Sequence, residues 1–227
     1  MAASSASMSP LIQDLLRLMP LHWLVAPPRL APDLLAELAP EGIQGQGPVP
    51  WWAAGLYQGQ LRHQLLQLRQ SPRGPLVGAL VQNLAAGLGA EPWSPPPLLV
   101  PIPSWKKRAN PLPGLLVGSL AWQLGWRPAQ LLKRSRPVLG QHHLGRDLRW
   151  ANQAGAFHAL PAPERQGNTG TPVLLIDDIL TTGATAWAAA QALGAQGWRV
   201  VGMACLGRTP PQGRDLRSLC RFGDGPG

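Results

Sequence analysis

Short, fully apolar runs alternate with longer helical stretches in the second half of the chain. The runs at 98–103, 172–176 and 199–206 have the length and composition of strands that are buried on both faces. Residues 114–125 and 184–197 have helical length, and the second stretch ends at a glycine. This alternation predicts an α/β protein with a mainly parallel sheet that helices flank. Ligands of such sheets bind at the carboxyl ends of the strands.

The first half of the chain is predicted to be helical, with a segment of little structure before it. Residues 55–70 are expected to form a tight turn and a helix whose leucines face inward and whose Arg62 and Arg69 face outward. A second helix is expected at 75–89. Residues 25–50 are rich in proline, glycine and alanine, which indicates a linker. We therefore expect a helical N-terminal extension with a linker at 1–54, one domain at 55–210 and a tail at 211–227.

Basic side chains are concentrated in the middle of the chain. The chain has 20 basic and 11 acidic residues, and its net charge of +9 favours an anionic partner such as a nucleotide, a nucleic acid or a lipid headgroup. Residues 92–146 contain eight basic side chains and no carboxylate. Two interpretations of this segment stay open, namely a solvated basic face or a wall that binds a polyanion.

Cysteine usage and hydropathy predict the compartment. The two cysteines, Cys205 and Cys220, have a spacing that fits neither a disulfide framework nor a zinc site. A reducing, cytoplasmic location is the simplest expectation. No apolar run approaches the roughly 18 to 20 residues that a membrane span needs, and the N-terminus lacks the charged segment of a signal peptide. We therefore expect a soluble protein that has no transmembrane segment and is not exported.

The most informative stretch is LLIDDILTTGAT at 174–185, where Asp177, Asp178 and a turn of threonine and glycine follow a predicted strand. Backbone N–H groups at the start of the next helix, with the hydroxyls of Thr181 and Thr182, can form a site for a phosphate monoester. Two carboxylates would repel a phosphate that they touched. A sugar phosphate removes this conflict, because its hydroxyls can donate to the carboxylates while its phosphate binds the turn. The alternative is that these residues only cap a turn and a helix.

The segment VLLIDDILTTGAT resembles the phosphoribosyl pyrophosphate binding motif of type I phosphoribosyltransferases, which combines an apolar run, an acidic pair and T-T-G-x-T. The resemblance implies the type I phosphoribosyltransferase fold. It also implies that Asp177 and Asp178 meet the ribose hydroxyls and that Mg²⁺ enters with the pyrophosphate, without a metal site made by the protein. The residues expected around the 5′-phosphate are Thr181, Thr182, Gly183, Ala184 and Thr185.

Three further blocks narrow the resemblance to ComF-like proteins, which are related to amidophosphoribosyltransferases and are associated with DNA uptake in natural competence. The blocks are YQGQLRHQLLQLRQ, in which Arg69 stands where a lysine is usual, LLVPIPSWKKR, and LLKRSRPVLGQHHLGRDLRWANQAGAF. The likeness covers roughly 55–208. It implies that the basic loop of Lys106, Lys107 and Arg108 binds the pyrophosphate.

The same resemblance implies a mobile loop that closes over the ligand and excludes water from the transition state. Gln141, Arg149 and Asn152 would lie on or beside this loop, and Arg149 joins the acidic pair as a candidate catalytic residue. Two interpretations stay open for His142 and His143. They act as a general base or contact a phosphate, or they are inert loop residues.

Two segments depart from the family pattern. Many ComF-like proteins carry an N-terminal four-cysteine zinc module, but residues 1–54 contain no cysteine, so no zinc is expected here. The sequence RANPLP at 108–113 replaces RGFNQ of the family, and its two prolines stiffen the loop. Among the tryptophans, Trp122, Trp187 and Trp198 are expected in the core, and Trp105 is the one candidate for base stacking.

Three hypotheses for function follow. The first is a phosphoribosyltransferase-like protein that binds phosphoribosyl pyrophosphate with Mg²⁺, or a nucleotide, and transfers the phosphoribosyl group to an unidentified nitrogen acceptor in connection with DNA uptake. The second is a non-catalytic module of the uptake machinery that binds nucleotides or single-stranded DNA. The third is nucleotide salvage with a purine or pyrimidine acceptor. Whether the protein turns over is left open by the sequence.

Overall fold

The computed structural model describes residues 38–70, 72, 75–104, 110–136, 146–163 and 170–210. Several predicted features lie outside the described residues. They are the extension up to residue 37, Trp105, Lys106, Lys107, Arg108, Gln141, His142, His143 and the tail at 211–227.

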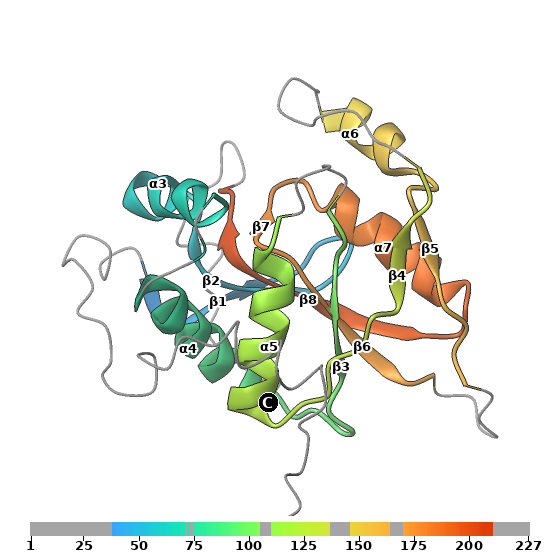
Figure 1. The fold of residues 1–227 in the computed structure, drawn as a ribbon, viewed down its shortest axis with the longest axis horizontal. Coiled ribbons are helices and arrows are strands. Elements are labelled where there is room, and N and C mark those ends of the chain that lie inside the picture. The colour runs from blue at the N-terminus through green and yellow to red at the C-terminus, as the bar shows by residue number, and fades with distance from the viewer. Residues whose placement is uncertain are drawn as a thin grey trace, which may run out of the picture.

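Strands and helices are interspersed along the chain (Figure 1). The strands are β1 (Leu38–Gly45), β2 (Trp51–Leu56), β3 (Leu98–Pro101), β4 (Leu132–Arg134), β5 (Phe157–Ala159), β6 (Pro172–Ile176), β7 (Ile179–Leu180) and β8 (Arg199–Arg208). The helices are α3 (Gly59–Leu68), α4 (Pro75–Gly89), α5 (Leu112–Leu124), α6 (Arg146–Gln153) and α7 (Ala184–Gly194).

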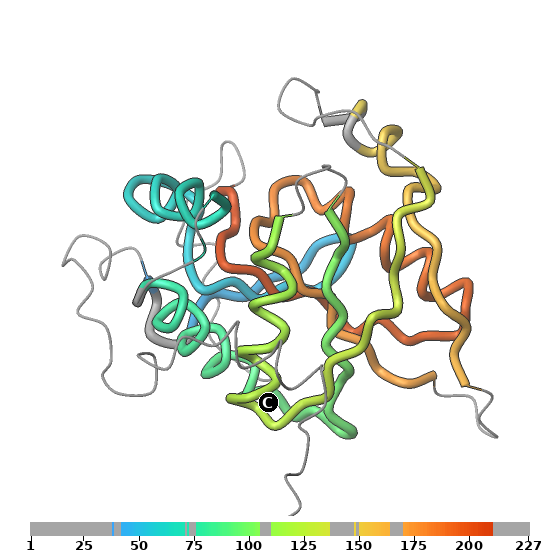
Figure 2. Tube along the Cα trace, viewed as in Figure 1, coloured from blue at the N-terminus to red at the C-terminus, as the bar shows by residue number. Residues whose placement is uncertain are grey.

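The central sheet has the strand order β1-β2-β8-β6-β3, and the short β7 pairs with β8. The antiparallel pair is β1 with β2, whereas the other pairings of this sheet are parallel. Figure 2 shows how the chain returns at its red end, β8, to lie beside the blue β1 and β2. A separate antiparallel pair joins β4 to β5. The predicted α/β fold with a mainly parallel sheet flanked by helices is therefore confirmed.

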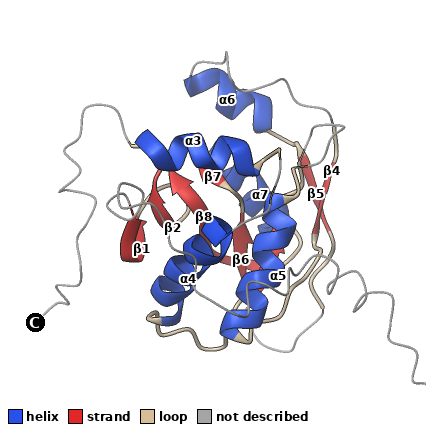
Figure 3. Ribbon diagram, turned by 60° about the vertical axis from the view of Figure 1, so that its left-hand side comes forward, coloured by secondary structure: helices blue, strands red, loops and turns tan. Residues whose placement is uncertain are grey.

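Each face of the sheet has its own core. On one face Leu174 and Ile176 of β6 pack with the buried leucines of α3, α4 and α5. On the other face Val173 and Leu175 pack with α7 and with the β4-β5 pair. Figure 3 shows α4 and α5 on the near side of the sheet and β4-β5 standing to its right.

The sequence located the longer elements well. The predicted strand 172–176 coincides with β6, and the predicted helix 75–89 coincides with α4. The expectation of a linker at 25–50 is wrong for its second half, because β1 lies there and extends the sheet. Proline and glycine in β1 hide this strand, which pairs with β2 alone among the described strands. The remaining domain boundaries stay predictions.

Two side-chain expectations are also wrong. Arg69 does not face outward but forms a partly buried ion pair at the end of α3. Trp122 is 69% exposed and Trp187 is 40% exposed, so neither belongs to the core, whereas Trp198 is 7% exposed and does. A helix rich in alanine and leucine leaves its polar face poorly marked, which explains why α5 and α7 were misjudged at these positions. None of the helices within the described residues has both the length and the apolar character that crossing a membrane requires.

Candidate functional site

The acidic pair lies at the carboxyl end of β6, in the middle of the sheet. The N–H of Asp177 donates to the carbonyl of Ala204 at 3.1 Å, so the chain stays attached to β8 one residue beyond β6. The carbonyl of Asp178 accepts from the N–H groups of Leu206 at 3.0 Å and Gly207 at 3.1 Å. These backbone bonds fix both carboxyls at the edge where ligands of parallel sheets bind.

The carboxylate of Asp178 is bound by side chains from two distant segments. Arg69 donates to it from Nε at 2.5 Å and from Nη2 at 2.9 Å, each to a different oxygen. Asn110 donates from Nδ2 at 2.7 Å, and its own Oδ1 accepts from the N–H of Leu112 in the first turn of α5. Asp178 is 2% exposed. One carboxylate therefore ties the end of α3 and the start of α5 to the central strand.

The ionisation of the two acids differs. Burial opposes the charge of Asp178, but the hydrogen bonds and charge of Arg69 and the amide of Asn110 outweigh it and hold the pKa of Asp178 below its usual range. Burial raises the pKa of Asp177 above its usual range, and the nearby charge of Asp178 raises it further. The pair therefore favours one charged and one neutral carboxyl, and Arg69 balances that charge. Two free carboxylates would repel a phosphate far more strongly.

Asp177 is half-buried, and its Oδ1 accepts from the N–H of Asp178 at 2.9 Å. This local bond shapes the turn after β6. The carboxyl of Asp177 also forms a side-chain hydrogen bond with Asp178, and its charge acts on Arg134 of β4, on the face that carries α7 and the β4-β5 pair.

The turn that follows is built for the start of a helix. Gly183 is the N-cap of α7 and has a φ of 84°, a left-handed conformation that favours glycine. The N–H of Ala184 donates to Oγ1 of Thr182 at 3.4 Å. Thr181, Thr182, Gly183 and Thr185 are half-buried and Ala184 is buried, so the predicted phosphate residues form one contiguous turn. The N–H groups at the start of α7 give this turn a partial positive charge.

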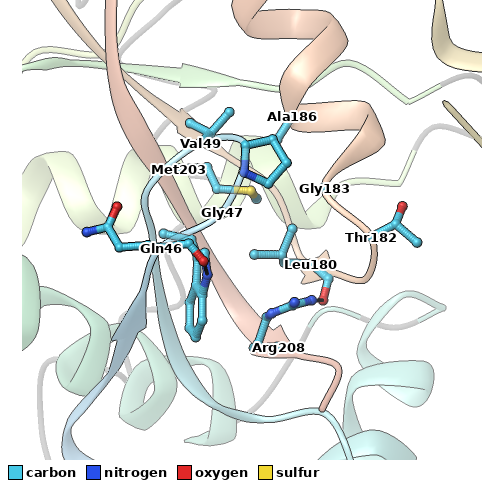
Figure 4. A pocket seen from close by; sticks show the side chains of 11 residues that line it. Gln46, Gly47, Val49, Leu180, Thr182, Gly183, Ala186, Met203 and Arg208 are labelled. Atoms are coloured by element: carbon cyan, nitrogen blue, oxygen red, sulfur yellow. Dashed lines mark hydrogen bonds between the residues drawn. The ribbon is translucent and has the colours of Figure 1, made fainter. Parts of the chain in front are cut away.

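Arg208, at the end of β8, is hydrogen-bonded to the backbone of this turn. Its Nη1 donates to the carbonyl of Leu180 at 3.1 Å and to the carbonyl of Thr181. In Figure 4 the guanidinium of Arg208 points toward Leu180, beside the turn that carries Thr182 and Gly183. A small cavity of about 30 Å³ lies here between the β1-β2 connection and α7. A cavity of this size can hold water.

A second arginine lies on the Asp177 face. Arg134 of β4 donates from Nε to the carbonyl of Pro103 at 2.9 Å and from Nη1 to Oε1 of Gln153 at 3.0 Å. Its guanidinium lies 4.1 Å from the ring centroid of Phe157. Burial lowers the pKa of Arg134 to about 10, and the charge of Asp177 opposes this shift. Pro103 lies just before the predicted basic loop, and Asn110 lies just after it. Pro103 accepts from Arg134 and Asn110 donates to Asp178, so both flanks of the loop are hydrogen-bonded at the site.

The structure brings together Asp177, Asp178 and the turn 181–185, as the sequence motif predicted, although their ligand roles stay predictions. Asn152 lies half-buried in α6, and its carbonyl accepts from Nη2 of Arg136 at 3.1 Å. Arg149 lies on the same helix, and its side chain is outside the described part. Sequence reasoning missed the site contacts of four residues. They are Arg69, Asn110, Arg134 and Arg208.

Metal-binding side chains do not gather in the described part of the chain, where no three His, Cys, Asp or Glu residues lie together. Cys205 is buried in β8, and burial raises the pKa of its thiol. Mg²⁺ prefers several oxygen ligands, and Asp178 has its oxygens occupied by Arg69 and Asn110.

The fold and the site together define a mainly parallel α/β protein with an acidic pair and a glycine-capped helix at the carboxyl edge of its sheet. No protein-family model matches the chain. The chain is similar to the "DNA utilization protein YhgH" of Salmonella typhimurium and of Salmonella typhi, with 33% identity over 156 residues in each case. The match covers 66% of this chain and 66% of each relative, just under two thirds of their length.

Phosphoribosyltransferases are among the solved structures that resemble the chain. The adenine phosphoribosyltransferase of Leishmania tarentolae matches with a TM-score of 0.39 and 23% identity over 73% of this chain and 81% of that one. The enzyme of Trypanosoma brucei, in complex with AMP, pyrophosphate and ribose-5-phosphate, matches with a TM-score of 0.40 and 14% identity over 77% and 90%.

Proposed function

We propose that the protein is a ComF-like, phosphoribosyltransferase-type protein that binds a pentose 5-phosphate at the carboxyl edge of its sheet. The ligand would be phosphoribosyl pyrophosphate with Mg²⁺, or a nucleotide. One observation carries the proposal. The acidic pair stands directly before a glycine-capped helix N-terminus, and Arg69 offsets the charge of Asp178, so sugar and phosphate subsites can coexist.

Each part of the ligand has a proposed contact. The 5′-phosphate binds the backbone N–H groups and hydroxyls of the turn 181–185, and the acidic pair binds the sugar. Lys106, Lys107 and Arg108 receive the pyrophosphate, since the segment that carries them is anchored on both flanks by bonds at the site. Gln141, Arg149 and Asn152 cover the ligand.

Group transfer is the proposed chemistry. A nitrogen nucleophile attacks the anomeric carbon, the bond to pyrophosphate breaks, and pyrophosphate leaves with both electrons. Mg²⁺ bound to the pyrophosphate would stabilise the charge of this leaving group. A carboxyl beside the sugar stabilises positive charge that develops on the ring. Because displacement of this kind needs no protein nucleophile, the buried Cys205 has no part in it. A cytoplasmic location and a link to DNA uptake belong to the same proposal.

Calorimetric titration of the full chain with phosphoribosyl pyrophosphate and Mg²⁺ tests the proposal. We expect heat of binding at millimolar ligand or below, weakened about tenfold or more by Asp177→Asn. Glu91→Gln is a matched control, since Glu91 accepts from Trp52 near the amino end of β2, at the opposite edge of the sheet. Absence of binding heat at millimolar ligand would contradict the proposal, and so would an equal loss in both variants.

A second candidate function is a non-catalytic module that binds single-stranded DNA. Two observations favour it, namely the resemblance to proteins named for DNA utilization and the acid-free basic segment 92–146. The test is binding to a labelled oligonucleotide over a range of salt concentrations. Affinity that falls with salt and survives Asp177→Asn together with Asp178→Asn favours the module, whereas pyrophosphate release that is lost in this double variant favours the enzyme.

A further inference from the structure

Exposed basic and aromatic side chains follow one another along the β3 edge of the molecule. We call this surface the edge strip, and it consists of Trp122, Arg127, Lys133, Arg136 and His158, all of which are exposed. We infer that the edge strip binds single-stranded nucleic acid through its phosphates and its unstacked bases. The inference rests on the second candidate function, for which it supplies the binding surface, and it does not depend on the pentose phosphate site.

The edge strip begins where the chain leaves α5 and pairs with the outer side of β3. The N–H of Leu99 donates to the carbonyl of Arg127 at 2.9 Å, and the N–H of Ala129 donates to the carbonyl of Leu99 at 2.9 Å. These bonds fix the backbone that carries the exposed guanidinium of Arg127. In Figure 1 this segment joins the lower end of α5 to β4. An extended chain from Arg127 to Arg136 would span roughly 30 Å.

The β4-β5 pair directs Lys133 and His158 to solvent. These two residues are directly opposite each other in the antiparallel register, so their side chains share one face of the pair. Leu132 and Ala159, the preceding pair in the register, are buried in the core on the other face. Since the core fixes which face of the pair is turned inward, the exposure of Lys133 and His158 follows from the register.

The charge of the edge strip is complementary to a polyanion. Arg136 is oriented by the carbonyls of Asn152 at 3.1 Å and Ala154 at 2.6 Å, and its side chain stays exposed. The described residues 92–104, 110–136 and 148–163 contain no Asp or Glu, so these segments offer no carboxylate to offset the cations. Cations that neutralise phosphates release the counterions of a nucleic acid, which favours binding.

Trp122 supplies an aromatic surface for a base. Its side chain is 69% exposed, although tryptophan is on average highly buried. Leu112, Leu116 and Leu120 mark the buried side of α5, and Trp122 lies on the opposite, outer side. An exposed indole can stack on any unpaired base, because each base has a π face. Trp122 therefore adds a contact that a free phosphate cannot use.

This combination favours a single strand over two other polyanions. A duplex keeps its bases stacked and paired, so it offers no free base to Trp122. A lipid surface is bound by several apolar side chains on one face of an amphipathic helix. The exposed large apolar residues of the described part lie instead on different elements, namely on α5, α6 and α7 and directly after β5.

The test is fluorescence anisotropy of a labelled oligothymidine of about 16 nucleotides, titrated with the full chain at several salt concentrations. For a single strand the logarithm of affinity falls with the logarithm of salt by about 0.7 per phosphate contact, so three cations predict a slope of about −2. Arg127→Met should reduce the magnitude of this slope by about 0.7. Arg62→Met removes the same charge from the exposed side of α3 and should leave the slope unchanged.

Trp122→Ala tests the stacking contact. Affinity should fall about tenfold while the salt slope stays the same, because an indole carries no charge. Trp187→Ala is the matched control, since Trp187 is an exposed tryptophan of α7, which packs on the opposite face of the sheet. Equal losses within either pair of variants overturn the inference and leave the second candidate function standing at another surface.

The remaining outcomes decide the class of partner. Absence of oligonucleotide binding at low salt overturns the second candidate function and the inference with it. Tighter binding to a duplex of the same length, or to vesicles that contain an anionic lipid, overturns the assignment to a single strand.

Discussion

The two faces of the central sheet bind adjacent carboxyls in opposite ways. On the face covered by α3, α4 and α5, Asp178 is buried, charged and bonded to Arg69 and Asn110. On the face of α7 and the β4-β5 pair, Asp177 is half-buried and favours its neutral form. The charge of Asp177 acts on Arg134 of this face, whose guanidinium donates to Pro103 and Gln153. The charge of Arg69 also acts on Asp177 and lowers its pKa, and the two carboxyls share a side-chain hydrogen bond.

This difference shows that an acidic pair need not act as a pair. The charge of Arg69 acts on both acids, but the recorded hydrogen bonds of its side chain go to Asp178 alone, as does that of the Asn110 amide. Here Asp178 joins distant segments of the fold, whereas the hydrogen bonds of the Asp177 carboxyl go to its neighbour Asp178. The division follows from the positions of Arg69 and Asn110, which lie 109 and 68 residues from Asp178 along the chain.

The largest effect is expected from removing Arg69, the cation on the face covered by α3, α4 and α5. Arg69→Met leaves the buried carboxylate of Asp178 with a neutral amide as its remaining side-chain donor, so the free energy of unfolding should fall by about 3 kcal/mol. Urea unfolding followed by circular dichroism measures the change. Arg62→Met removes an exposed arginine from the same helix and should change stability by less than about 0.5 kcal/mol. Equal effects in the two variants would show that the ion pair stabilises nothing.

A second change addresses the helix of the Asp177 face. Gly183→Ala places a side chain on a backbone with a φ of 84°, which should destabilise the protein by about 1.5 kcal/mol through backbone strain. Steric contact is not the reason, because the nearest atom to the new Cβ is 3.8 Å away in Pro48. Gly194→Ala is the matched control at the other end of α7, where a Cβ meets nothing within 4 Å and no positive φ occurs. It should be neutral or stabilising by up to about 1 kcal/mol, and thermal melting distinguishes the two.

The two acids should contribute slopes of opposite sign to the dependence of the unfolding free energy on pH. The pKa of Asp177 is raised in the folded state, so the folded protein binds its proton more tightly and stability falls as pH rises above the unfolded pKa. The pKa of Asp178 is lowered, so its contribution is present above the unfolded pKa and is lost as the pH falls through the folded pKa. Each slope is at most about 1.4 kcal/mol per pH unit.

Single variants assign these slopes. Asp177→Asn should remove the loss of stability toward higher pH, whereas Asp178→Asn should remove part of the loss toward acid. Unfolding free energies from urea titrations at several pH values give both. The assignment fails if the slope toward higher pH persists in Asp177→Asn.

Contiguous features of the fold and site could be predicted from the sequence. The apolar run of β6, the acidic pair and the turn 181–185 form one stretch, so their order in the sequence is also their order in space. Strand β1 was missed because pairing with β2 and packing of α4 stabilise it, and neither contact leaves a local pattern. The three-residue strands β4 and β5 are too short to show alternation.

The partners of the acidic pair could not be predicted either, because contacts between distant segments leave no local pattern in the sequence. Arg69 ends a helix whose leucines mark the buried side, and an arginine one position after the last leucine looks exposed by periodicity. Its replacement of a usual lysine was a visible signal, since arginine can bind a carboxylate through two parallel N–H groups. Asn110 lies in the segment RANPLP, where the ComF-like pattern that the chain resembles differs, and its contact with Asp178 gives that segment a structural role.

The smallest expected effect concerns the cation of the Asp177 face. Arg134→Met frees the carbonyl of Pro103, which precedes the predicted pyrophosphate loop, so binding of phosphoribosyl pyrophosphate should weaken about fivefold, the value of roughly one hydrogen bond. Ribose 5-phosphate, which lacks the pyrophosphate, should bind with unchanged affinity. Lys133→Met is the matched control, because Lys133 is the exposed neighbour of Arg134 on β4. Calorimetry with both ligands separates the outcomes. An equal loss for both would mean that Arg134 acts on the sugar subsite through Asp177, and the two faces of the sheet would then share one task instead of dividing it.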